Sequence, residues 1–275
     1  MKIENIPYVF LVGIIFIAAG CFRPPEFPDE PEISFNNIVF IPGEEFDGSL
    51  ILSVDFQDGD GDIGLSGADD DFPYHPFDIV VDNKEDTVFF RDGVREFDGK
   101  DRQASPPFYR LSPDGIRTML SEIDNRDDVF TCIQYQILNA DVTELVNVNG
   151  VLQERKRSVV VDTFQIVRNE NHNNFYVNFK RKVNGQFVDF DFRSVGNSDF
   201  CGEDFNGRFP IFDQRNFEEG NAIAGTIDYD MFSLGFGLVF RRDTFRIDAS
   251  IRDRALNLSN EISTPEFTLE SITRE

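Results

Sequence analysis

Short runs in which apolar and polar residues alternate recur along the chain from residue 33 onward, and they constrain the fold more than any other feature of the sequence. Gly, Pro, Asn or Asp interrupts each run. Side chains of a strand point alternately to opposite faces of its sheet, so this period of two predicts half-buried strands. The expected strands are 33–41, 49–56, 77–82, 86–90, 158–167, 174–183, 186–192, 222–229, 243–251 and 266–269.

Two local signals refine this prediction. Asn149-Gly150 and Asn184-Gly185 each separate two apolar runs, and both residue types adopt the positive φ angles that a two-residue hairpin turn needs. Residues 113–123, PDGIRTMLSEI, have helical spacing behind a proline suited to a first turn, so we expect one short helix there.

The expected fold class is all-β. Many short strands with frequent turns favour β-sandwich architecture, and the 31 Phe residues agree with it because Phe favours strands. The length of 275 residues suits one large or two ordinary domains. We expect two sandwiches, residues 33–157 with the acidic loop and residues 158–275, divided near the basic run ERKR (154–157).

The net charge excludes a nucleic-acid partner. Fifty Asp and Glu residues against 26 Lys and Arg residues give −24. Such a chain repels phosphate backbones and anionic surfaces and attracts cations or basic partners.

The N-terminus predicts export and lipidation. An apolar run at residues 6–20 is too short for a stable membrane span and ends in small residues before Cys21, so residues 1–20 are interpreted as a signal peptide. Ala18-Ala19-Gly20-Cys21 resembles the lipobox of bacterial lipoproteins, which implies acylation of Cys21. Residues 21–32 are rich in proline and acids and are expected to form a flexible tether. The protein is therefore expected at the outer membrane, on its periplasmic or cell-surface face, attached to the membrane through the lipid.

The C-terminus carries a second resemblance. DTFRIDASIRDRALNLSN followed by STPEFTL is similar to the closing hairpin of bacterial Ig-like and fibronectin-like domains, with Asp253, Ala255, Asn257 and Ser259 in the turn and Leu256 where Gly is usual. The resemblance implies Ig-like sandwiches. The lipobox, the segment VDFQDGDGDIG and this ending together resemble uncharacterised Bacteroidota lipoproteins, a family that brings no established activity.

Cys132 and Cys201 remain once Cys21 is assigned to the anchor. Two cysteines in an exported protein commonly pair, so we expect a disulfide, with two buried thiols as the alternative.

The strongest candidate site is an acidic loop. Residues 24–83 hold sixteen Asp and Glu residues and no Lys or Arg, so either these carboxylates are splayed into water or a cation lies among them. The spacing Asp58-Gly59-Asp60-Gly61-Asp62 resembles calcium loops of the D-x-D-x-D kind, because the alternate carboxylates supply hard oxygen ligands and the glycines allow a tight turn. Predicted Ca²⁺ ligands are Asp58, Asp60, Asp62 and Asp69. No EF-hand frame is complete, and a solvated turn is the alternative.

Catalytic motifs are not found in the sequence: it has no nucleophile elbow, no P-loop and no HExxH. We therefore expect a non-catalytic, lipid-anchored interaction or structural module of the cell envelope, stabilised by calcium and bound to an envelope protein or a glycan. The alternatives are a carbohydrate- or peptide-binding lipoprotein of a surface uptake system and an envelope hydrolase.

Overall fold

A computed structural model of the chain describes residues 27–43, 47–91, 94–97, 104–121, 135–148, 151–192, 205–210, 222–233, 235–240 and 242–274. The fold is nearly all-β, as predicted, and is built from several antiparallel sheets. Within these ranges no helix is both long enough and apolar enough to cross a membrane.

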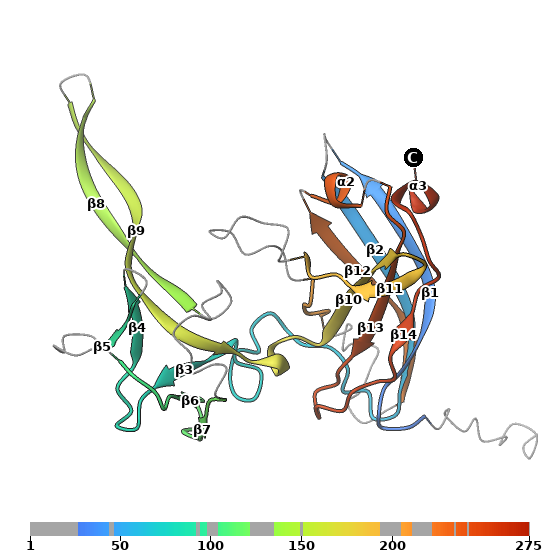
Figure 1. The fold of residues 1–275 in the computed structure, drawn as a ribbon, viewed down its shortest axis with the longest axis horizontal. Coiled ribbons are helices and arrows are strands. Elements are labelled where there is room, and N and C mark those ends of the chain that lie inside the picture. The colour runs from blue at the N-terminus through green and yellow to red at the C-terminus, as the bar shows by residue number, and fades with distance from the viewer. Residues whose placement is uncertain are drawn as a thin grey trace, which may run out of the picture.

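Two sheets face each other to form a sandwich (Figure 1). The first has the order β1-β2-β12, with β1 (Glu32–Pro42), β2 (Gly48–Asp58) and β12 (Ile223–Ser233). The second has the order β11-β10-β13-β14, with β11 (Gln186–Asp189), β10 (Phe175–Val183), β13 (Phe245–Ile251) and β14 (Ile262–Ser263). Short helices accompany them: η2 (Glu170–His172), α2 (Phe236–Val239) and α3 (Leu269–Ile272).

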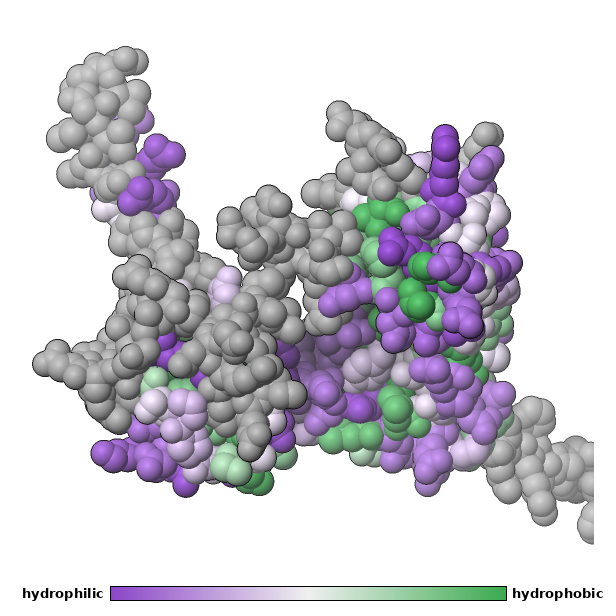
Figure 2. Space-filling model, in the orientation of Figure 1, coloured by the Kyte–Doolittle hydropathy of each residue, from purple (hydrophilic) through white to green (hydrophobic). Residues whose placement is uncertain are grey.

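Aliphatic side chains and many phenylalanine rings fill the space between these sheets. β2 contributes the buried side chains of alternate residues, and β13 contributes a matching row from the opposite sheet. Phe236 and Phe240 of the α2 turn are fully buried and contact neighbouring rings in edge-on, tilted and stacked arrangements. Many of the Phe residues of the chain are therefore packed in this core, while hydrophilic side chains predominate on the visible face of the sandwich (Figure 2).

A third sheet stands beside the sandwich (Figure 1). Its order is β5-β4-β9-β3-β6-β7, and β8 pairs with β9. The strands are β3 (Phe77–Val81), β4 (Val88–Arg91), β5 (Val94–Phe97), β6 (Tyr109–Leu111), β7 (Arg117–Met119), β8 (Tyr135–Val148) and β9 (Val151–Arg168). Its core among the described residues is small, with Val80, Val88, Ala104, Phe108 and Leu120. The described part of β3–β9 thus forms one sheet rather than a second sandwich.

The predicted division at 157/158 does not coincide with a boundary between sheets. It falls inside β9, and β2 from the first predicted domain pairs along its whole length with β12 from the second. The chain builds two sandwich strands, leaves for the third sheet, and returns at β10. Periodicity could not reveal this, because it shows that a segment is a strand without showing which strand it pairs with.

One predicted turn is confirmed, the turn at Asn149-Gly150 lies outside the described residues, and two other local predictions are wrong. Asn184 and Gly185 have φ angles of 52° and 81°, as a two-residue hairpin turn requires. Residues 113–121 of the expected helix instead form a turn and β7, because Gly115 adopts a φ of 84° and Ser112 N–H bonds to the carbonyl of Ile116. The expected strand 266–269 is only an isolated bridge between Phe267 and Phe245, followed by α3.

Candidate cation site

Asp58 is an acid at a core position. It ends β2, in which the side chains of alternate residues from Gly48 to Asp58 are buried, and it continues the row formed by Leu50, Leu52, Val54 and Phe56. Its exposed fraction is 0%, and neither of its carboxylate oxygens makes a hydrogen bond of normal geometry, although the backbone N–H of Gly61 is close enough to favour the ionised form. A buried carboxylate normally has hydrogen bonds or an opposite charge, so Asp58 requires an explanation.

Asp253 reaches the same place from the opposite sheet. It follows β13 with the parity of the buried Ile247, Ala249 and Ile251, and its exposed fraction is 1%. Its carboxylate accepts hydrogen bonds from Asn257, from the backbone N at 2.7 Å and from Nδ2 at 2.8 Å. These bonds orient the side chain while leaving part of its acceptor capacity free.

Asp62 joins them from the loop after β2. Gly61 turns the chain with a φ of 70°, and Ile63 forms an isolated antiparallel bridge with Asp253. The N–H of Arg254 donates to the backbone carbonyl of Asp62 at 3.1 Å. The loop and the C-terminal turn are therefore joined by backbone hydrogen bonds, which fixes their carboxylates relative to each other.

The three carboxylates have a spacing compatible with a calcium ion. One oxygen from each of Asp58, Asp62 and Asp253 lies within 4.8 Å of the other two. Oxygens that bind Ca²⁺ at about 2.3–2.6 Å are at most about 5 Å apart across the ion. An oxygen of Asp62 is also buried without a partner, which adds a second unsatisfied ligand atom to those of Asp58.

Without a cation, the group resists ionisation. Burial, followed by the negative charges of Asp60 and Asp62, raises the pKa of Asp58 to about 7. Burial and the charges of Asp253 and Asp60 raise the pKa of Asp62 to about 6. The pKa of Asp253 is also raised, with burial as its largest cause. A divalent cation would reverse these shifts, because it favours the charged form of each ligand.

The other two predicted ligands lie differently. Asp60 contacts its own loop, with Oδ1 accepting from Asp62 N at 3.4 Å. Asp69 is held by protein groups instead: its Oδ2 pairs with Arg254 Nη1 at 3.0 Å and accepts from Ser66 N at 2.8 Å. Of the predicted ligands, the structure thus brings together Asp58 and Asp62, and Asp253, which the sequence analysis did not predict, lies with them. Asp69 forms an ion pair with Arg254 instead.

Part of the acidic segment is neutralised from far along the chain. Arg208 donates to the backbone carbonyls of Ser66, Asp69 and Tyr74 and lies 3.5 Å from a carboxylate oxygen of Asp70. Arg208 and Arg254 therefore stabilise the 66–74 part of the loop, whereas Asp58 and Asp62 at its start lie beside another acid, Asp253.

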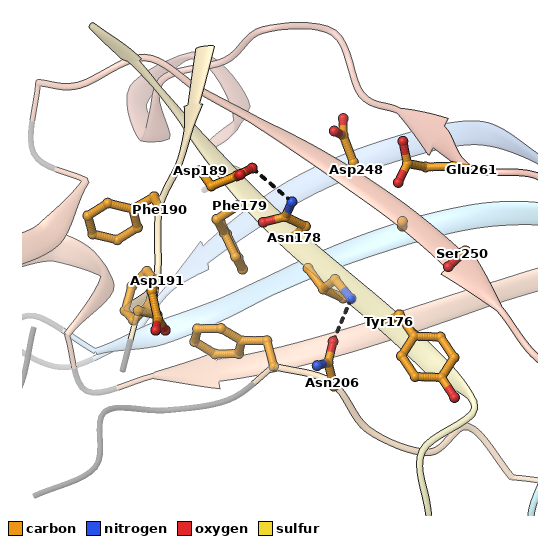
Figure 3. Close-up of a pocket in the computed structure, with 14 residues that line it drawn as sticks. Tyr176, Asn178, Phe179, Asp189, Phe190, Asp191, Asn206, Asp248, Ser250 and Glu261 are labelled. Atoms are coloured by element: carbon orange, nitrogen blue, oxygen red, sulfur yellow. Dashed lines mark hydrogen bonds between the residues drawn. The ribbon is translucent and has the colours of Figure 1, made fainter. Parts of the chain in front are cut away.

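A groove on the second sheet is the other candidate surface (Figure 3). It has a volume of about 480 Å³ and lies along β10 and β13. Amides, acids and aromatic rings line it, including Tyr176, Asn178, Asp189, Asn206 and Glu261. Asn178 Nδ2 donates to Asp189 at 3.1 Å, so part of the polar lining is fixed by internal hydrogen bonds.

Cys21, Cys132 and Cys201 lie outside the described residues. Lipidation and the disulfide therefore stay predictions. No protein-family model, curated protein or solved structure was found to match this chain, so the functional argument depends on the geometry of the site.

Proposed function

We propose that the protein is a non-catalytic, lipid-anchored module of the cell envelope whose sandwich is held together at one end by a bound calcium ion. The observation that carries this proposal is the side chain of Asp58, which is fully buried with two unpartnered carboxylate oxygens beside Asp62 and Asp253. An ion there would join β2 and its loop to the turn after β13. Because β2 and β13 belong to the two different sheets, the ion would connect both sheets of the sandwich.

Calcium is the cation that suits this site best. Three carboxylates supply hard oxygen ligands and −3 of charge, and Ca²⁺ tolerates the irregular geometry of ligands taken from a strand end, a loop and a turn. Mg²⁺ requires near-ideal octahedral geometry at shorter distances. Modules outside the cytosol commonly bind calcium with dissociation constants of about 10⁻⁴–10⁻³ M, and we expect a value in this range.

Isothermal titration calorimetry of the purified full-length protein in detergent, at pH 7.5, tests the ion. We expect Ca²⁺ to bind with one site per chain, Mg²⁺ to bind at least about tenfold more weakly, and Asp58→Asn to abolish binding. Asp71→Asn is the matched control, because Asp71 is an exposed acid of the same segment. Absence of calcium binding by the wild type would refute the proposal.

The anchor is supported by the N-terminal sequence. Acyl chains on Cys21 would hold the protein at a membrane, since each buried methylene contributes about 0.8 kcal/mol. Metabolic labelling with a palmitate analogue should mark the wild type and not Cys21→Ser. Equal labelling of both proteins would refute the lipid anchor.

The groove favours a second candidate function, binding of a glycan or peptide in a surface uptake system. Its combination of amides, carboxylates and aromatic rings is typical of sites that orient a polar ligand. A panel of soluble oligosaccharides and peptides, screened against the wild type and Glu261→Gln, tests it. Binding that the substitution leaves unchanged, or no binding by the wild type, would remove this candidate.

A further inference from the structure

We infer that the cation also fixes the N-terminal segment, residues 27–33, to the sandwich, and so controls where the chain leaves the fold toward its anchor. This inference rests on the proposed cation site. The sequence predicts a flexible tether up to residue 32, but the structure shows that its last residues are in contact with the sandwich at the acidic cluster.

The first contact is at Gly59, next to Asp58. A Cβ atom placed on Gly59 would lie 2.4 Å from the carbonyl oxygen of Phe27 and 2.6 Å from that of Pro28. The backbone of the segment therefore crosses Gly59 with no room for a side chain between them. Any movement of the loop that begins at Gly59 must displace the segment as well.

The second contact is with Asn260, which follows the C-terminal turn that contains Asp253. Ile33 N–H donates to Asn260 Oδ1 at 2.8 Å, and Asn260 Nδ2 donates to the Ile33 carbonyl at 2.9 Å. Ser259 ties this residue to β13, because its Oγ accepts from Ile251 N at 2.9 Å and donates to the Asn260 carbonyl at 2.8 Å. The segment is thus held at one end by the loop that follows Asp58. At the other end, where it enters β1, it is held by Asn260 and by the pairing of β1 with β2.

We infer that a bound cation strengthens both contacts by reducing charge repulsion. The segment carries exposed Asp29, Glu30 and Glu32 and no base. Without a cation, ionised Asp58, Asp62 and Asp253 repel one another and repel this acidic segment; a divalent cation removes most of that repulsion. It also holds the loop and the turn at the separation that the segment spans.

Linkage makes the inference testable. If the cation strengthens docking of the segment, docking must strengthen cation binding by the same factor. Gly59→Ala pushes on the Phe27 and Pro28 carbonyls without removing a carboxylate, and Asn260→Ala removes both hydrogen bonds to Ile33. We expect each substitution to weaken calcium binding about fivefold or more in calorimetry of the full-length protein. Gly67→Ala is the matched control, since a Cβ there meets nothing within 4 Å.

Hydrogen exchange supplies the second measurement. Calcium, compared with NaCl of equal ionic strength, should slow exchange in the peptide that contains Ile33 about fivefold or more, and should do so less in Gly59→Ala and in Asn260→Ala. A peptide from β10 (Phe175–Val183) monitors the body of the sandwich.

The outcomes separate the two proposals. Calcium binding by the wild type with unchanged exchange at Ile33, or with unchanged affinity in both Gly59→Ala and Asn260→Ala, would overturn the inference alone. Failure of the wild type to bind calcium would overturn the proposed function and the inference together. If Gly59→Ala does not fold, Asn260→Ala, which alters an exposed side chain, decides the matter.

Discussion

Replacing Asp58 by Asn should stabilise the cation-free protein at alkaline pH, although most substitutions at buried sites destabilise. The folded-state pKa of Asp58 is about 7, against an ordinary value of 3.8. The unfolded chain therefore releases this proton at lower pH than the folded protein does. The contribution of Asp58 to stability is greatest below about pH 4 and is lost as the pH rises through 7.

The pKa difference sets the magnitude. Each unit corresponds to about 1.4 kcal/mol, so ionised Asp58 lowers the free energy of unfolding by about 4 kcal/mol above pH 7 relative to strongly acidic solution. At pH 5 the folded carboxyl is still protonated while the unfolded one is ionised, and the loss is only about 1.5–2 kcal/mol. Because Asn does not titrate, the stability of Asp58→Asn relative to wild type should rise by about 2.5 kcal/mol between pH 5 and pH 8.

Urea unfolding in the presence of a chelator, at pH 5 and pH 8, measures this difference. The unpartnered amide of Asn costs about 1–3 kcal/mol at both pH values, so it shifts both measurements equally. Calcium at about 100 times its dissociation constant should add about 2.7 kcal/mol to the wild type and little to the variant. A stability difference between the two proteins that is the same at pH 5 and pH 8 would show that Asp58 does not carry the raised pKa.

Three further predictions follow from particular contacts. Asp69→Ala should lower the free energy of unfolding by about 1 kcal/mol, through loss of the partly buried Arg254 pair and the Ser66 hydrogen bond. It should leave calcium affinity unchanged in calorimetry, and a loss of affinity comparable to that in Asp58→Asn would make Asp69 a ligand after all. Leu256 has a φ of 70°, which costs a branched side chain about 1–2 kcal/mol, so Leu256→Asn should raise the melting temperature by a few degrees, whereas Ala255→Gly, at a neighbour with an ordinary φ, should lower it. Thiol titration of denatured, oxidised Cys21→Ser should find no free thiol before reduction and two afterwards if Cys132 and Cys201 are paired, and two from the start would disprove the disulfide.

Much of the secondary structure could be predicted from the sequence because it depends on local chemistry. The alternation in residues 49–56 corresponds to β2, and Asn184-Gly185 forms the predicted turn. The alternating patterns of β2 and β13 also indicate two residues of the candidate cation site. Asp58 and Asp253 continue the buried rows of β2 and β13, so an acid in phase with core residues at a strand end marks each of them.

The tertiary structure alone decided which acids meet. Asp58 and Asp253 are 195 positions apart, and they come together because β2 and β13 belong to facing sheets whose corresponding ends coincide. Asp69 lies closer to Asp58 in sequence but pairs with Arg254, a residue that only the fold brings near. Alternation determines which face of a strand is buried, but strand pairing and charge neutralisation depend on partners far along the chain, and the sequence pattern of one segment carries no information about them.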